Sequence, residues 1–111
     1  MNRDELIALL EIKKDLPVIV EGKKDVAALR AYDFRSIFPL EGHALYQVVE
    51  QFEKGSTVQI LTDLDAEGKK LFAKLRADLS QRGVHIDNEL REALFRTDLR
   101  QIEGLVSYLK N

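Results

Sequence analysis

Short runs of β-branched and aliphatic residues alternate along this chain with longer segments whose apolar residues recur at helical spacing. The clearest runs cover 18–20 and 57–62, and shorter candidates fall at 36–38 and 84–86. Strands that alternate with helices are joined by right-handed crossovers, which make the sheet mostly parallel and place helices on both of its faces. The alternation therefore predicts an α/β protein with a mostly parallel, four-stranded sheet.

The helical segments are marked by apolar residues three or four positions apart. Asn2 and Glu5 have the form of a capping box at the start of the first segment, and Gly83 is placed to end the fourth. We expect helices at about 3–14, 25–31, 44–53, 66–82, 88–96 and 98–110. A chain of 111 residues with these elements has the length of one domain.

Charge and composition narrow the classes of function. The chain has 17 Lys and Arg residues against 19 Asp and Glu residues, so a nucleic-acid partner would be bound at a local site rather than by a broadly basic surface. The absence of cysteine excludes disulfides, thiol catalysis and thiolate metal sites, and it suits a reducing cytoplasm. The N-terminus carries acids where a signal peptide has bases, and the apolar runs are too short to cross a bilayer. We expect a cytoplasmic protein with no membrane partner.

Three acids follow the two clearest strands directly. Glu21 comes after the run at 18–20, and Asp63 and Asp65 come after the run at 57–62. In parallel sheets the ligand site lies beyond the carboxyl ends of the strands, so neighbouring strands would bring these carboxylates to one edge. Two such aspartates can hold Mg²⁺, which takes one or two carboxylates and keeps several waters. A third carboxylate with a raised pKa could act as a general acid or base.

Each of these acids also has a simpler interpretation. Asp65 has the position of an N-cap for the helix that starts near Ala66. Asp63 could be a solvated residue at a strand end, and Glu21 could be a surface or ion-paired residue. The joint pattern is more specific than its parts, because a glycine follows each group of acids at a fixed place, Gly22 and Gly68.

The segments VIVEGKKD at 18–25 and LTDLDAEGKKL at 61–71 resemble the two signature motifs of the Toprim domain. That domain is shared by bacterial-type primases, type IA and type II topoisomerases, OLD-family nucleases and a ribosomal RNA maturation ribonuclease. The Asp-x-Asp-x-Glu-Gly form at 63–68 is most similar to the type IA topoisomerases, as is Gly42-His43 after the second expected strand. The Glu-Gly-Lys-x-Asp form at 21–25 resembles the ribonuclease and primase versions.

Within the superfamily the chain looks most like the small stand-alone Toprim proteins of archaea, which often carry segments similar to 89–91 and 102–105. The resemblance implies a single Rossmann-like Toprim domain over 1–111, with helices at about 1–15 and 98–111 as additions. Lys69 is a departure, because type IA topoisomerases usually have a further acid at that place.

The resemblance also implies the roles of the site residues. Mg²⁺, with Mn²⁺ as an alternative, would be held chiefly by Asp63 and Asp65 together with Glu21, and Glu21 would act as the general acid or base. Asp25 matches the acid of the first motif by position, and we expect it to cap or orient the following helix. Gly22, Gly42 and Gly68 belong to the motifs as structural residues.

Basic residues adjoin both acidic motifs and are candidates for binding a phosphate backbone. Four of them are Lys23, Lys24, Lys69 and Lys70, and each taken alone is also consistent with a solvated helix start. His43 would face the site from the end of the second strand, although a lone histidine is often structural or exposed. Arg91 and Arg96 could reach a phosphate or pair with Glu89 or Glu92.

The reaction is limited by what the chain lacks. A topoisomerase needs a nucleophilic tyrosine, normally from another domain, and Tyr46 and Tyr108 are better explained by packing or by surface positions. A zinc ribbon, which a primase would use, is impossible without cysteine. We therefore expect Mg²⁺-dependent phosphodiester hydrolysis of RNA or DNA. The alternative is a non-catalytic binding or scaffold subunit that works with a protein partner or a second copy of itself.

Overall fold

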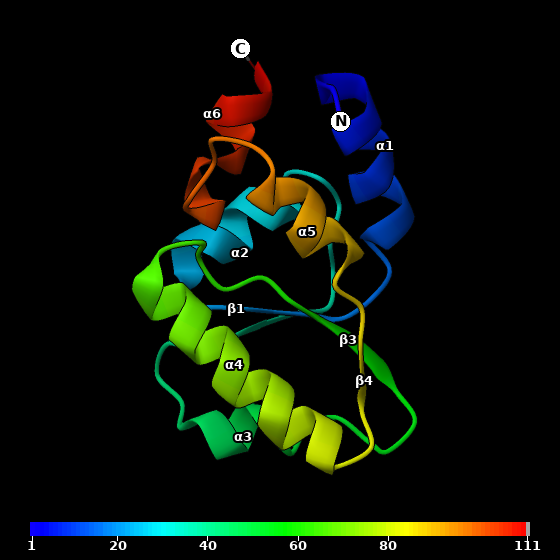
Figure 1. The fold of residues 1–111 in the computed structure, drawn as a ribbon, viewed down its shortest axis with the longest axis vertical. Helices are drawn as coiled ribbons and strands as arrows, with labels where there is room; N and C mark the ends of the chain where they lie inside the picture. The colour runs from blue at the N-terminus through cyan, green and yellow to red at the C-terminus, as the bar shows by residue number, and fades with distance from the viewer. Residues whose placement is uncertain (111) are drawn as a thin grey trace.

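The computed structural model describes residues 1–110 and contains four strands with helices between them (Figure 1). The strands are β1 (Val18–Val20), β2 (Ile37–Pro39), β3 (Thr57–Ile60) and β4 (His85–Ile86). The helices are α1 (Arg3–Lys13), α2 (Lys23–Arg30), α3 (Leu45–Val49), α4 (Ala66–Gln81), α5 (Glu89–Phe95), the 3₁₀ turn η1 (Ile102–Gly104) and α6 (Leu105–Lys110). The sheet has the order β2-β1-β3-β4 and every pairing is parallel, which confirms the predicted α/β fold.

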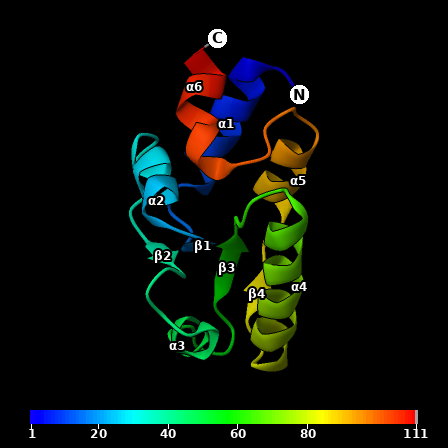
Figure 2. The ribbon, with the colours of Figure 1, turned by 90° about the vertical axis from the view of Figure 1, so that its left-hand side faces the viewer.

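Both faces of the sheet are covered by helices. Because successive side chains of a strand point to opposite faces, Val18 and Val20 of β1 enter one core and Ile19 enters the other. The first core packs against α1, α2, α5 and α6, and the second packs against α3 and α4. Figure 2 shows these two groups of helices on either side of the strands.

Several elements are shorter than the sequence suggests. The helix expected over 98–110 is helical only from Ile102, because the Arg100 carbonyl and the Ile102 N–H are hydrogen-bonded to the turn after β3, at the Leu64 N–H and the Asp63 carboxylate. Asn111 lies outside the described residues. The helix expected over 44–53 ends at Val49, where a turn brings Phe52 into the second core.

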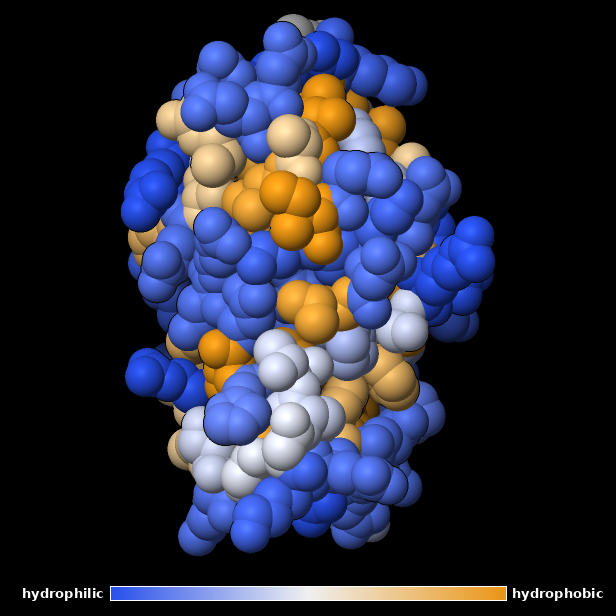
Figure 3. Space-filling view, turned by 90° about the vertical axis from the view of Figure 1, so that its right-hand side faces the viewer, coloured by the Kyte–Doolittle hydropathy of each residue, from blue (hydrophilic) through white to orange (hydrophobic). Residues whose placement is uncertain are grey.

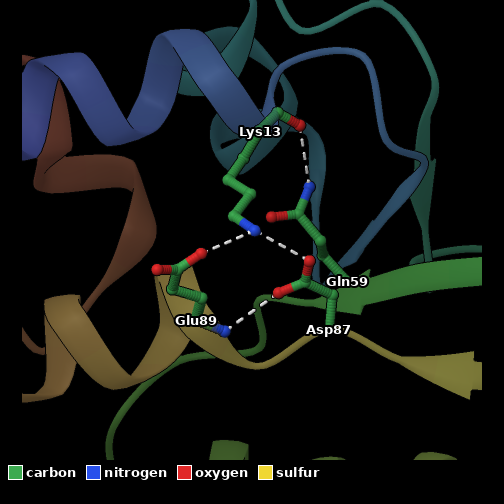
Figure 4. Close-up of polar contacts among 4 residues, drawn as sticks. All are labelled: Lys13, Gln59, Asp87 and Glu89. Atoms are coloured by element: carbon green, nitrogen blue, oxygen red, sulfur yellow. Dashed lines mark hydrogen bonds and ion pairs between the residues drawn. The ribbon is translucent and has the colours of Figure 1, made fainter.

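The buried Lys13 side chain attaches α1 to the segment that follows β4, the edge strand of the sheet (Figure 4). The capping box of α1, with Asn2 and Glu5, forms as expected. At the other end of α1, Lys13 Nζ lies 2.8 Å from Asp87 Oδ2 and 2.7 Å from Glu89 Oε1. The Gln59 side-chain amide of β3 donates to the Lys13 carbonyl over 3.1 Å. These contacts hold α1 against the segment that joins β4 to α5.

The surface is mixed in character. On the face in Figure 3, groups of apolar atoms lie between hydrophilic side chains. Large apolar side chains that are exposed among residues 1–110 are Met1, Ile12, Tyr46, Phe95 and Tyr108. Within the same residues, no helix combines the length and the apolar character that crossing a bilayer requires.

Candidate functional site

The two acidic motifs meet at the carboxyl edge of the sheet. Glu21 follows β1 directly, and Asp63 comes three residues after β3, which pairs with β1 in parallel. The backbone N–H of Asp63 donates to Glu21 Oε2 over 2.6 Å. The starts of α2 and α4 and the turn η1 gather at this edge, on the left of Figure 1 and facing the viewer in Figure 2. The structure thus brings together the acids that the strand-end argument placed together.

The Asp63 carboxylate is fixed by the C-terminal part of the chain. Its Oδ1 accepts a hydrogen bond from the backbone N–H of Ile102 over 3.0 Å. The next residue of the same turn, Leu64, donates its N–H to the Arg100 carbonyl over 2.7 Å. Sequence reasoning noted 102–105 only as a segment similar to the archaeal proteins, and it did not assign that segment to the site. The Ile-Glu-Gly-Leu similarity was the one available signal.

Asp65 serves as the N-cap of α4. Its Oδ1 accepts from the Gly68 N–H over 2.8 Å, so the capping interpretation is confirmed. Position 68 requires glycine because the backbone of Asp63 lies too close for a side chain: a Cβ at Gly68 would lie 1.9 Å from the Asp63 carbonyl oxygen. The buried Thr62 hydroxyl donates to the Gly68 carbonyl over 2.6 Å. Hydrogen bonds and close packing therefore set the shape of the second motif.

The first motif has its own internal cap. Asp25 is buried, and its Oδ2 accepts from the Gly22 N–H over 2.9 Å. This contact closes the turn between β1 and α2 and confirms the orienting role expected for Asp25. Glu21 is partly exposed at the same turn, and its carbonyl accepts from the Glu41 N–H that follows β2.

The pKa values of three acids at this edge, Glu21, Asp25 and Asp63, are raised above the usual values of free carboxyls. Burial raises the pKa of Glu21 and the hydrogen bond from Asp63 opposes it, while the charges of Asp63, Asp65 and Asp25 raise it further. Burial also raises the pKa of Asp63 and of Asp25, and the nearby Glu103 carboxylate adds to both shifts. Glu103 is an acid of the site's surroundings that sequence reasoning missed. The edge is therefore favourable for a cation or a proton.

Arg91 occupies a different place from the phosphate-binding rim expected for it. It is 6% exposed, and its guanidinium donates to the Thr62 carbonyl over 2.6 Å and to the Asp63 carbonyl over 3.4 Å. The guanidinium also lies 4.4 Å from the centre of the Phe72 ring. Burial lowers the pKa of Arg91, against the opposing charges of Glu21 and Asp63. Arg91 thus stabilises the turn at Asp63 through its hydrogen bonds to the backbone, and contact with a substrate would require these bonds to be exchanged.

The lysines of both motifs are exposed at the starts of the two helices. Lys23 and Lys24 lie in the first turn of α2, and Lys69 and Lys70 lie one turn into α4. The Lys69 ammonium sits 4.8 Å from the centre of the Phe95 ring. His43 is exposed in the loop after β2, where Gly42 takes a positive φ of 83°. Their contacts with a substrate stay predictions.

The acids of the edge differ in how much of each carboxylate is open to a metal ion. Within residues 1–110, no group of three His, Asp or Glu side chains is arranged to hold one. Asp63 and Asp65 each give one carboxylate oxygen to a backbone N–H, so each has a second oxygen that could face a cation. Carboxylate oxygens suit Mg²⁺, which binds through one or two carboxylates with waters completing its shell. The donor chemistry of Asp63 and Asp65 suits a hydrated Mg²⁺, whereas residues 1–110 contain no cage of three carboxylates.

Comparison with known proteins agrees with the fold and with both motifs. The Toprim domain model matches residues 17–100, which include all four strands and the three acids. The protein is therefore a member of the Toprim superfamily, whose domains typically bind Mg²⁺.

The particular family follows from its relatives. The UPF0292 protein of Methanocaldococcus jannaschii is 29% identical, over 98% of this chain and 96% of the relative. The UPF0292 protein of Pyrococcus horikoshii is 38% identical, over 84% of this chain and 74% of the relative. A protein from Aquifex aeolicus with a solved structure has a TM-score of 0.84 and 30% identity, over 93% of this chain and 97% of that one. The chain belongs to the UPF0292 family of small Toprim proteins.

Proposed function

We propose that this protein is a cytoplasmic, Mg²⁺-dependent phosphodiesterase that acts on nucleic acid. The observation that carries the proposal is the 2.6 Å hydrogen bond between the Asp63 N–H and Glu21 Oε2, which joins the two motifs at one edge. The raised pKa of Glu21 adds support, because a carboxyl that binds its proton more tightly is better suited to proton transfer near neutral pH.

Each side chain has a definite part in this reaction. Asp63 and Asp65 would hold the ion through the carboxylate oxygens that do not accept backbone hydrogen bonds. An ion held there would supply positive charge against the scissile phosphate and a position for the attacking water. Glu21 takes a proton from the attacking water, or gives one to the leaving oxygen, and its hydrogen bond to the Asp63 amide keeps it in place.

The lysines at the starts of α2 and α4 supply the contacts with the backbone of the substrate. Lys23, Lys24, Lys69 and Lys70 are exposed around the acidic edge. With the cation bound, these four positive charges and the ion oppose the carboxylates, so the local field favours a polyanion although the chain has a net charge of −2. His43 lies in the loop after β2 and is a further candidate for substrate binding.

The test is a cleavage assay on single- and double-stranded RNA and DNA with Mg²⁺ or Mn²⁺. We expect cleavage by the wild-type protein and none by Glu21→Gln, and loss of cleavage in EDTA. Cleavage that persists in Glu21→Gln would come from a contaminant or another site, and the proposal would fall.

A second candidate function is a non-catalytic subunit that binds nucleic acid together with a partner protein or a second copy. The observations that favour it are the small size of the chain, 111 residues, and its near-neutral net charge of −2. Binding without cleavage under every condition of the assay, with Glu21→Gln equal to wild type in affinity, would select this function.

A further inference from the structure

One exposed aromatic ring stands close to the acidic site. Phe95, in the last turn of α5, is 44% exposed. The Lys69 ammonium of α4 lies 4.8 Å from its ring centre, which is a cation–π contact. Lys69 is four residues beyond the Asp65 cap, about one helical turn along α4, so the ring contacts a residue of the helix that the second motif begins.

A stripe of mixed character runs down α4 from the site toward this ring and past it. Asp65, Lys69, Phe72 and Arg76 are separated by four, three and four residues, which places them on one face of the helix. At 1.5 Å per residue the stripe extends roughly 16 Å. Phe72 is held by the buried Arg91 guanidinium, 4.4 Å from the centre of its ring. The stripe therefore has one rigid aromatic position between two cations.

The stripe and α5 form the two walls of a groove of about 280 Å³. Its lining consists of Lys69, Phe72, Arg76, Asn88, Arg91, Glu92 and Phe95. A volume of this size is at the lower end of small-molecule pockets and suits one planar ring system rather than a larger ligand. Asn88 lines the groove, and its buried Oδ1 has no hydrogen-bond partner within residues 1–110.

The charge of the groove differs from that of the whole molecule. Three basic side chains and one acid line it, whereas the chain as a whole has two more acids than bases. Cations beside aromatic rings are the combination by which proteins bind single-stranded nucleic acid, since the cations contact phosphates and the rings stack on bases.

We propose that this groove binds a base of a single-stranded nucleic acid, stacked on Phe95, with Lys69 and Arg76 on the adjoining phosphates. The proposal rests on the proposed function and adds the class of substrate, because the groove begins one turn of α4 from the residues assigned to hydrolysis. A base within a duplex has both faces covered by its neighbours, so only an unpaired base can use the ring.

The composition of the chain allows a direct test. It contains no tryptophan, so Phe95→Trp introduces a single indole whose fluorescence is quenched when a base stacks on it. The substitution is combined with Glu21→Gln and measured with Mg²⁺, so that the strand stays intact. We expect quenching by single-stranded RNA or single-stranded DNA oligonucleotides, with the two arms telling which is preferred. Equal quenching by a duplex of the same sequence, or none by any single strand, would overturn the proposal.

Affinity gives a second measurement that does not depend on the new indole. A stacked base contributes enough that Phe95→Ala should raise the Kd for a single strand by roughly 5- to 100-fold. Tyr46→Ala is the matched control, because Tyr46 is an exposed aromatic residue of α3 that does not line the groove. An unchanged Kd in Phe95→Ala with a wild-type melting curve would remove the base site.

The two proposals can fail separately. Quenching and a raised Kd without any cleavage would leave the base site standing and contradict hydrolysis. Cleavage by wild type with the same KM in Phe95→Ala would leave hydrolysis standing and contradict the base site.

Discussion

The backbone N–H of Asp63 donates to Glu21 Oε2 over 2.6 Å, although the two residues are 42 positions apart in the chain. This bond links the ends of β1 and β3, and it uses the Glu21 carboxylate in the same place where the proposed reaction needs it. The position of the catalytic group and the integrity of the turn after β3 are therefore coupled.

Glu21→Gln separates these two roles. The amide oxygen of Gln can still accept from the Asp63 N–H, so the melting temperature should change little. The proton-transfer role is lost, and the cleavage rate should fall by about 10²- to 10⁴-fold. Glu50→Gln, an exposed glutamate at the end of α3, is the matched control and should keep full activity. Similar rates in both variants would exclude Glu21 from the chemistry.

Removal of divalent cations should weaken nucleic-acid binding as well as cleavage. Without a cation, the carboxylates of Asp63 and Asp65 stand uncompensated beside the phosphate path, and the net charge of the chain is −2. Anisotropy titrations of a labelled oligonucleotide in Mg²⁺ and in EDTA measure this effect. Tight binding in EDTA would contradict the proposed place of the metal.

Gly68 should resist substitution because of packing rather than backbone flexibility. A Cβ at Gly68 would lie 1.9 Å from the Asp63 carbonyl oxygen, so Gly68→Ala should cost about 2–3 kcal/mol or more of unfolding free energy. At Gly104 the added Cβ would meet only Leu99 Cδ1 at 3.5 Å, an ordinary contact. Gly104→Ala is thus the control, with an expected cost below about 1 kcal/mol. Urea unfolding measures the loss of stability in each variant, and equal losses in Gly68→Ala and Gly104→Ala would contradict the packing explanation.

Arg91→Met tests whether the Arg91 guanidinium stabilises the turn that carries Asp63. The variant keeps an apolar stem beside Phe72 but leaves the carbonyls of Thr62 and Asp63 without their donor. We expect a loss of about 2–4 kcal/mol. Arg96→Met changes an exposed arginine next to the same helix and should stay within about 0.5 kcal/mol of wild type. Equal stabilities in urea unfolding would mean that Arg91 does not hold the turn.

The sequence was sufficient for the fold and for the central pair of acids. Both followed from rules of local pattern and parallel topology, which place strand ends such as those before Glu21 and Asp63 at one edge. The contact between Ile102 and Asp63 was out of reach, because it depends on the path of an irregular segment 39 positions away. The burial of Arg91 depends on how α5 is rotated against β3, which helical spacing alone does not fix.

A further prediction concerns the stability of the fold rather than the acidic site, and it rests on the ion pairs of Lys13. Lys13→Met removes the ion pairs to Asp87 and Glu89 and leaves Asp87 partly buried without its partner. We expect a loss of about 1–3 kcal/mol at pH 7. Lys14→Met is the matched control, since the pair between Lys14 and Glu11 is at the surface and contributes little.

The stability lost in Lys13→Met should depend on pH in a direction set by both partners. Burial raises the pKa of Asp87, but hydrogen bonds from Lys13 and from the Glu89 N–H outweigh it, so its pKa in the folded protein lies below the usual value. The stability that Asp87 contributes is therefore fully present above about 3.9, its pKa in the unfolded chain. It is lost as the pH falls through the lower pKa that Asp87 has in the folded protein. The hydrogen bond to Asp87 raises the pKa of Lys13. The stability that Lys13 contributes is therefore fully present below about 10.4, its pKa in the unfolded chain, and is lost as the pH rises through the higher pKa in the folded protein. Urea unfolding at pH 3 and pH 7 should show the difference between wild type and Lys13→Met shrinking in acid, and an equal difference at both pH values would refute the pairing.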